Sequence, residues 1–432
     1  MATPERLSQL LLLGFAAAAL SAPGSAQTGH VLNGVGPVNQ SMAGASTAAP
    51  LDASGAIQWN PAALSGLERS QIQFGMELLV PDVALESKVS APVAMSGSSE
   101  SDLGASPIPS FGFAYKIADS DWTFGFGAFG LSGFGVEYKA SNKNPILLPP
   151  PNGFGSISSE FQLMQIAPSL AYQMDKNWSV GFAPTLNRAA LRINPGCFAA
   201  PDDADGDGFP TYPDGLNGAT SWGYGGQVGV LYQGEAGWNF GASYKSEQNF
   251  GDFEFNSTDE VGNYRQLTLD MDFPAILSLG TAYTGLDKWL FALDLRYIDY
   301  QNTDGFGEAR FNPDGSVNGF GWDSILVMAF GAQYQVDDCL SLRGGYAFNQ
   351  NPISDANSGF NVPAPAIIQH HASLGGSYCV GEDWFIDLAY RHGFENSVEG
   401  PMGHPAIGPI PGTSVTNTMS TDSILVGFRV VF

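Results

Sequence analysis

Charged residues are scarce in this chain of 432 residues. Only 14% of the residues are Asp, Glu, Lys or Arg, whereas a soluble globular protein usually carries about 25%. Positive charge is the scarcer kind, since 17 Lys and Arg stand against 42 Asp and Glu, for a net charge of -25. We therefore expect no nucleic-acid partner, because binding to phosphates depends on basic side chains.

Long apolar runs are lacking after the N-terminus, although the mean hydropathy is close to zero. A membrane-spanning helix needs about 20 consecutive apolar residues. The chain has instead 54 Gly and 12% aromatic residues. This balance favours alternating membrane strands over membrane helices.

The N-terminal segment has the pattern of a signal peptide. Arg6 precedes an apolar stretch over residues 10–20, and residues 24–26 are small enough for a cleavage point. We assign residues 1–26 to a signal peptide that is removed after export, which makes Gln27 the first mature residue.

A Tyr–turn–Trp unit recurs along the chain, in which one apolar strand ends in Tyr and Trp opens the next. The six units are Tyr115 with Trp122, Tyr172 with Trp178, Tyr232 with Trp238, Tyr283 with Trp289, Tyr334 with Leu340 in the Trp position, and Tyr378 with Trp384. Tyr and Trp settle at the headgroup level of bilayers, so the units predict an aromatic girdle. The alternative is a soluble β-sandwich with aromatic turns.

Side chains alternate in character between these turns. After Trp289, the apolar Phe291 and Leu293 alternate with Ala292 and Asp294. One apolar face and one polar face are typical of a barrel with lipid outside and a polar lumen inside.

The six turns join twelve strands, and further strands at about 70–82 and 420–432 make fourteen. The other connections are long, for example about 83–105, 250–264 and 396–419. We therefore predict an all-β fold, a 14-stranded antiparallel transmembrane β-barrel over residues 69–432, in the outer membrane of a Gram-negative bacterium. Its aromatic end, Phe432, is of the kind that the barrel-assembly machinery reads.

Residues 27–68 do not have a strand pattern, because small and polar residues dominate. Asn60 suits an N-cap, Pro61 the first helical position and Gly66 a stop, so a short helix is expected there. We predict that this segment, the hatch, plugs the lumen of the barrel.

With these features the chain resembles the FadL-type outer-membrane transporters of long-chain fatty acids and other hydrophobic compounds. The resemblance covers essentially the whole mature chain. Its most specific part is Asn60-Pro61-Ala62, and further matching stretches lie at 271–280, 342–346 and 351–353. The resemblance implies capture of ligand by outer loops, an apolar pocket inside the barrel, and lateral release through a kink in the third strand.

The third strand has five glycines between positions 125 and 135, and glycine permits bends and bulges in strands. We predict the kink at Ser132, Gly133, Phe134 and Gly135. The alternative is that these glycines only pack against bulky neighbours.

An acidic loop over residues 203–214 has the oxygen spacing of a calcium loop, and we predict that it binds Ca²⁺. The expected ligands are Asp203, Asp205, Asp207, Asp214 and the carbonyl of Phe209. The alternative is a solvated acidic loop. No cofactor is expected to be required for transport.

Two kinds of ligand contact are expected. Phe198, Phe209 and Tyr212, which flank or lie in the acidic loop, are predicted to form part of the first docking surface. Arg343 is predicted to meet a ligand carboxylate, because an anion in a dry pocket needs a cation. The alternative for such a lumen cation is an ion pair with an acid such as Asp294.

Cys339 and Cys379 lie on neighbouring strands at the same end of the barrel, in an oxidising compartment. We predict a disulfide between them, and two buried thiols are the alternative.

These features predict a monomeric, non-enzymatic transporter of long-chain fatty acids or similar molecules, embedded in outer-membrane lipid and lipopolysaccharide. An aromatic hydrocarbon is the alternative ligand. An outer-membrane lipid hydrolase is a weaker hypothesis, because no Ser-His-Asp or Cys-His arrangement is evident. An adhesin or an open porin is a further alternative.

Overall fold

The computed structural model describes residues 28–91 and 94–432. The predicted signal peptide, residues 1–26, lies outside the described residues. Among the described residues, no helix is both long enough and apolar enough to cross a bilayer.

Fourteen antiparallel strands form a closed barrel, which confirms the predicted fold class. Strands that follow one another pair side by side, and the first closes the ring by pairing with the last, from Gln71–Val431 to Val89–Thr413. Closure pairs the backbone groups of the first and last strands, so neither of them is left as an exposed edge. The strands are β1 (Gln71–Val89), β3 (Ser106–Lys116), β4 (Trp122–Tyr138), β5 (Ile157–Gln173), β6 (Trp178–Asn194), β7 (Gly215–Gln233), β8 (Trp238–Lys245), β12 (Ile276–Leu286), β13 (Trp289–Ile298), β14 (Ile325–Gln335), β15 (Leu340–Asn349), β16 (His370–Gly381), β17 (Trp384–Gly400) and β20 (Thr413–Val431).

The wall has an apolar outer face and a polar inner face, as the alternation predicts. In β8, Trp238 and Phe240 are 46% and 52% exposed, whereas Asn239 and Ser243 are only 6% and 5% exposed. The exposed rings face outward, where lipid would contact them.

The aromatic girdle lies at the end of the barrel with the short turns, but its contacts differ from the sequence units. Trp122 packs against Tyr172, at 4.6 Å between ring centroids, rather than against Tyr115 of its own unit. The same contact recurs between Trp238 and Tyr283 at 4.7 Å. The reason is the register, which places Trp122 directly opposite Tyr172 on the neighbouring strand.

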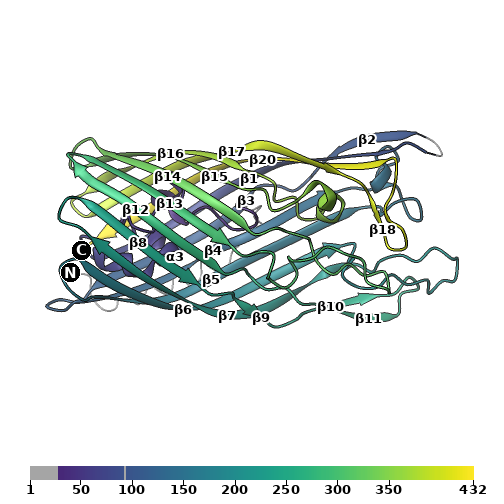
Figure 1. Cartoon of the computed structure of the whole chain (residues 1–432), viewed down its shortest axis with the longest axis horizontal. Helices are drawn as coiled ribbons and strands as arrows, with labels where there is room; N and C mark the ends of the chain where they lie inside the picture. The colour runs from purple at the N-terminus through teal and green to yellow at the C-terminus, as the bar shows by residue number, and fades with distance from the viewer. Residues whose placement is uncertain (1–27, 92–93) are drawn as a thin grey trace.

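Several strands run further outward than predicted. β1 continues to Val89 instead of about 82, and β20 begins at Thr413 instead of about 420. Pairing depends on backbone groups rather than on hydropathy, so it continues after the lipid-facing alternation has ended. The smaller elements of the outer connections are β2 (Met95–Glu100), β9 (Asn249–Phe250), β10 (Phe253–Thr258), β11 (Tyr264–Leu269), β18 (Gly403–His404), β19 (Gly408–Pro409), η2 (Pro145–Leu147) and η3 (Asp355–Asn361). Figure 1 shows β2, β10, β11 and β18 towards the end opposite the C-terminus.

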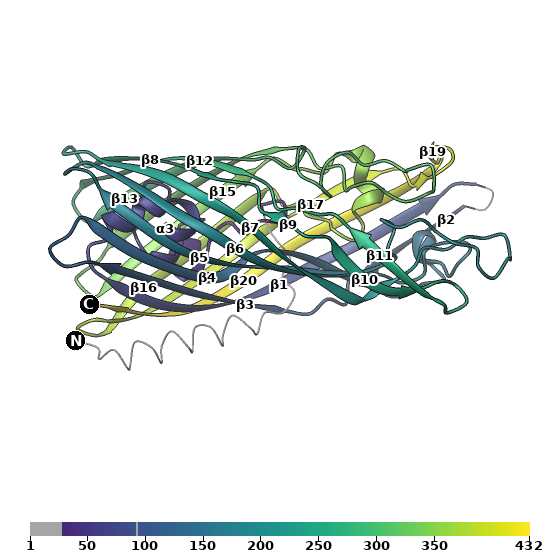
Figure 2. The same cartoon turned by 90° about the horizontal axis from the view of Figure 1, so that it is seen from below.

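The hatch folds into three short helices inside the barrel, α2 (Gly36–Ser41), α3 (Ala53–Trp59) and η1 (Pro61–Gly66). From Thr28 to Leu67, no residue is exposed. Asp52 caps α3 by accepting from Gly55 N, and Asn60 caps η1 by accepting from Ala62 N. Figures 1 and 2 both show α3 within the ring of strands, towards the end with the short turns.

Candidate functional site: an apolar cavity above the hatch

A cavity of about 560 Å³ lies among the outer connections of the barrel. This volume falls in the range of small-molecule sites. Its described lining contains no charged side chain, and most of the lining is aliphatic or aromatic. The apolar side chains of the lining are Val89, Met95, Pro145, Ile146, Leu148, Phe154, Ile157, Leu191, Ile193, Pro195, Phe198, Leu269, Phe311, Val317, Phe320, Phe360, Val362, Pro363, Met402 and Ile410.

Two of the three predicted docking aromatics line this cavity. Phe198 packs on Phe255 of β10 at 5.2 Å between centroids. Tyr212 also lines the cavity, and its hydroxyl donates to the carbonyl of Gly315 over 2.7 Å. Phe209 is 56% exposed and is not part of the lining, because it lies at the tip of the loop.

Cys197 adds a polarisable apolar atom to the same lining. Burial raises the pKa of the Cys197 thiol to about 12. The thiol is therefore neutral at physiological pH and contributes no charge to the cavity.

Arg343 lies far from the cavity along the barrel, in β15 close to the short turns, and is not part of the lining. Its guanidinium donates to Gln333 Oε1 over 2.6 Å and to Ser377 Oγ over 2.7 Å. Ser377 in turn donates to Asp387, which pairs with Arg429. Among the described residues Arg343 forms no ion pair with an acid and is linked to Asp387 only through Ser377, and its position in β15 separates it from the docking aromatics.

The acidic loop assembles a different set of oxygens from the predicted one. Carboxylate oxygens of Asp203, Asp205 and Glu260 lie within 4.8 Å of one another. Asp207 and Asp214 are not part of this set, and each accepts from the backbone N–H group two residues further on, over 2.8 and 3.0 Å. Sequence spacing could not indicate Glu260, because this residue comes from the separate turn between β10 and β11.

Calcium binding stays a prediction, and the two ligand sets can be tested separately. If the assembled carboxylates hold Ca²⁺, the Asp205→Ala variant should lose saturable heat in calorimetric titration of the purified protein with Ca²⁺. The Asp207→Ala variant, which removes a carboxylate outside the assembled set, should keep most of that heat. Absence of a saturable signal in the unmodified protein would end the hypothesis.

The predicted kink region follows an irregularity in β4. Pairing with β3 ends at the Ser110–Phe129 pair, while the register with β5 shifts between Gly130 and Ser132. Beyond Phe129, β4 pairs on one side only with β5, and a bulge of this kind bends the strand. The four predicted residues, Ser132, Gly133, Phe134 and Gly135, come directly after the bulge and are all buried.

The hatch fills the place that β3 leaves beside β4. The backbone N–H of Leu32 donates to Leu131 O over 3.0 Å, and Val31 forms a β-bridge with Ser132. A void of only about 10 Å³ lies next to this contact, lined by hatch residues 32 and 34–36 and by Gly130 and other wall residues. The break in the wall is therefore closed by the hatch itself.

The hatch motif holds the hatch to β6 and β7, two and three strands along the wall from β4. Asn60 Nδ2 donates to Thr47 O over 2.8 Å and to Val230 O of β7 over 2.9 Å. Pro61 opens η1, and Ala62 approaches β6 so closely that a Cβ at Gly181 would lie 2.3 Å from its nitrogen. These contacts explain why the motif needs an amide side chain followed by compact residues.

Buried ion pairs hold the rest of the hatch. Arg296 pairs with Asp294 over 2.6 Å and donates to Gly44 O, and Arg391 pairs with Glu77 over 2.7 Å and donates to Gln40 of α2. Within each pair both side chains are at most 5% exposed. These cations therefore serve the junction between the hatch and the barrel wall.

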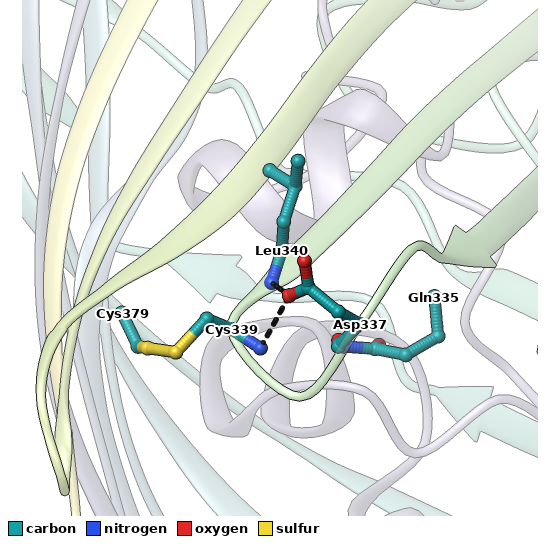
Figure 3. The surroundings of a disulfide bond; sticks show 5 residues. All are labelled: Gln335, Asp337, Cys339, Leu340 and Cys379. Carbon is teal, nitrogen blue, oxygen red and sulfur yellow. Dashed lines mark hydrogen bonds between the residues drawn. A yellow bond between two sulfur atoms is a disulfide. The ribbon is translucent and has the colours of Figure 1, made fainter.

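Cys339 and Cys379 are joined by a disulfide between neighbouring strands. Figure 3 shows it beside the short turn after β14, where Asp337 Oδ1 accepts from the backbone N–H groups of Cys339 and Leu340 over 2.8 and 2.9 Å. The disulfide links the β14–β15 hairpin to the β16–β17 hairpin, at the end of the barrel remote from the cavity.

Comparison with known proteins places the chain among transport proteins. A family model described as "Outer membrane protein transport protein (OMPP1/FadL/TodX)" matches residues 15–430. The long-chain fatty acid transport protein of Escherichia coli (strain K12) is 22% identical over 397 residues, 81% of this chain and 84% of that protein.

Solved structures share the fold. A Pseudomonas aeruginosa FadL homologue has a TM-score of 0.71 at 15% identity, covering 94% of this chain and all of that one. The toluene transporter TbuX of Ralstonia pickettii has a TM-score of 0.68 at 20% identity, covering 93% and 99%. With its closed barrel, its buried N-terminal helices and a family match over nearly its whole length, the chain belongs to the OMPP1/FadL/TodX family of Gram-negative outer-membrane transporters of hydrophobic compounds, which are not enzymes.

Proposed function

We propose that the protein takes up long-chain fatty acids or similarly hydrophobic molecules across the outer membrane. Outer loops capture the molecule, the cavity above the hatch holds it, and it leaves sideways into the membrane at the break between β3 and β4. The observation that carries this proposal is the cavity of about 560 Å³ without a charged group in its described lining.

The lining supports a hydrophobic ligand on energetic grounds. Each Å² of apolar surface removed from water contributes about 25 cal/mol to the binding free energy. Almost the whole surface of an alkyl chain or an aromatic ring is apolar. A polar solute in this cavity would lose hydrogen bonds to water, at roughly 1–3 kcal/mol for each unpaired group.

The path from the cavity to the lipid is supported by the position of the hatch. The hatch lies against the bulged part of β4, and its residues 31–32 are the ones that occupy the missing strand position. Displacing these residues would open the wall next to Ser132 without breaking the β4–β5 pairing. The barrel could therefore release a ligand sideways and stay intact.

An aromatic hydrocarbon is the second candidate ligand. The described lining offers no cation for a carboxylate, and the predicted partner, Arg343, lies elsewhere. A neutral hydrocarbon has no such need. A fatty acid would have to keep its carboxylate at the mouth of the cavity, in contact with water.

Uptake of labelled oleate and of labelled toluene tests the proposal and separates the two ligands. A strain that lacks its own transporter would be compared with and without this gene. We expect a gain of at least severalfold for one of the two compounds. No gain for either compound would refute the transport proposal.

A pair of phenylalanine variants from one outer loop locates the binding event. Phe198→Asp puts a carboxylate into the cavity lining, and we expect it to lower uptake at least tenfold, because a buried charge is not paired there. Phe209→Asp is the matched control, since Phe209 is exposed and outside the lining. An equal loss in both variants would place capture on the loop surface instead of the cavity.

A further inference from the structure

The first turn of the hatch is hydrogen-bonded to the hydroxyl of Tyr300, a residue of the connection that follows β13. The Tyr300 oxygen lies 3.1 Å from His30 N, which donates to it, and 2.9 Å from His30 Nδ1. The hydroxyl also donates to Thr28 O over 3.1 Å. Tyr300 is fully buried, so one hydroxyl contacts the turn at three points.

The ring of His30 lies in an aromatic box. Five rings have centroids within 6.0 Å of it: Phe161, Phe273, Tyr300, Phe306 and Trp322. Burial lowers the pKa of His30 from 6.5 to about 3, so the imidazole is neutral at physiological pH. Among the described residues, Tyr300 is the one hydrogen-bond partner of this ring, since Nε2 has none.

This box connects the cavity with the break in the wall. Phe320 lines the cavity and packs on Phe306 at 5.8 Å and on Trp322 at 6.1 Å. On the other side, the carbonyl of His30 accepts from Ser132 Oγ over 2.6 Å and from Gly133 N over 3.1 Å. The same hatch residue therefore contacts the ring layer beneath the ligand site and the bulged strand.

Packing alone does not account for the hydroxyl. A phenyl ring would fill the box as well, and a buried hydroxyl destabilises the fold unless it is hydrogen-bonded. The hatch is shaped to receive it, because Gly29 has φ +62° and a Cβ there would lie 2.4 Å from the Tyr300 oxygen. Glycine supplies both the left-handed backbone and the close approach.

We propose that Tyr300 is a positioning residue for transport, whose hydroxyl latches the hatch turn at residues 28–31 against β4 until a hydrophobic ligand shifts the rings of the aromatic box. The latch rests on the proposed function for its role. Its physical existence can be tested without any ligand. Releasing the turn frees the carbonyl of His30 from Ser132 and Gly133. The wall then opens where β4 is no longer paired with β3.

Hydrogen exchange of the purified, detergent-solubilised protein, followed by mass spectrometry, tests the latch. In Tyr300→Phe, the peptide spanning residues 28–35 should exchange about tenfold faster or more than in the unmodified protein, because the bonds to Thr28 and His30 are lost. Gly29→Ala should give the same result from the hatch side. Exchange of this peptide at the unmodified rate in both variants would overturn the proposal.

Tyr138→Phe is the matched control, since Tyr138 is a buried tyrosine whose hydroxyl has no hydrogen-bond partner among the described residues. It should leave exchange of residues 28–35 unchanged. If Tyr138→Phe accelerates exchange as much as Tyr300→Phe, the effect is general loosening and the latch is refuted.

A transport readout separates the latch from the proposed function. Faster exchange in Tyr300→Phe together with no uptake of oleate or toluene by the unmodified protein would keep the latch and refute the proposed function. Normal uptake by the unmodified protein with unchanged exchange in Tyr300→Phe would refute the latch alone.

If the latch and the proposed function are both correct, saturating oleate or toluene should accelerate exchange of residues 28–35 in the unmodified protein. The same compounds should add little to the exchange rate of Tyr300→Phe. A ligand effect that persists in full in the variant would show that another contact holds the turn.

Discussion

Replacing Asp294 with alanine is expected to loosen the hatch inside an intact barrel. Asp294 Oδ2 accepts from Ser46 N, Thr47 N and Thr47 Oγ1 over 2.9, 3.0 and 2.8 Å, and pairs with Arg296. Its removal leaves the guanidinium buried beside Trp59 without a counter-charge. Breaking such a buried pair costs roughly 3–5 kcal/mol.

The loss of stability should affect the hatch and spare the barrel wall, because the hydrogen bonds between β13 and its neighbours do not involve the Asp294 side chain. Limited proteolysis of the purified variant should cleave within residues 28–68 at least tenfold faster, and planar bilayers should show ion conductance. Asp383→Ala is the control, since the Arg69–Asp383 pair is 48% and 43% exposed and such pairs contribute about 0–1 kcal/mol. Equal proteolysis in both variants would contradict the assigned role of Asp294.

Replacing Asn60 with alanine is the second large change. The side chain donates to Thr47 O and Val230 O and accepts from Ala62 N, and two of these three hydrogen bonds are fully buried. Each partner left unsatisfied costs about 1–3 kcal/mol. We expect a barrel that still shifts its electrophoretic mobility on heating but whose uptake of the transported compound changes at least severalfold. The double variant with Pro61→Ala should show a larger change.

Asn217→Ala is the matched control, because the Asn217 amide donates to Asn256 O in an exposed outer position. It should leave both mobility and uptake unchanged. If instead Asn60→Ala prevents assembly of the barrel, residues 60–62 are scaffold and the view of the hatch as a moving part is wrong.

The barrel could be predicted because its signals are local and periodic. Two-residue alternation sets the two faces of each strand, and a Tyr–turn–Trp unit marks each short turn, so both can be read within ten residues. The strand limits were less predictable: β20 begins seven positions before the expected 420, since backbone pairing with β1 does not depend on side-chain hydropathy.

The site could be predicted only in part. Phe198 and Tyr212 lie in the cavity lining, because the loop that carries them must fold over the mouth of the barrel. The role predicted for Arg343 rested on the need of a buried anion for a cation and on a matching stretch, and neither says at what depth a cation lies. The contact between His30 and Tyr300 could not be predicted, since the two residues are 270 positions apart and leave no local pattern.

By itself, the sequence determined the class of the protein: an exported, 14-stranded barrel with an N-terminal plug motif, because hydropathy, period and turn residues are properties of neighbouring positions. Only the tertiary structure decided what lies inside it. The cavity, the ion pairs of the hatch and the contact between Tyr300 and the first hatch turn join residues from distant strands and loops. Such contacts depend on the register and on how the loops fold over the lumen, and these are set by the closed ring as a whole.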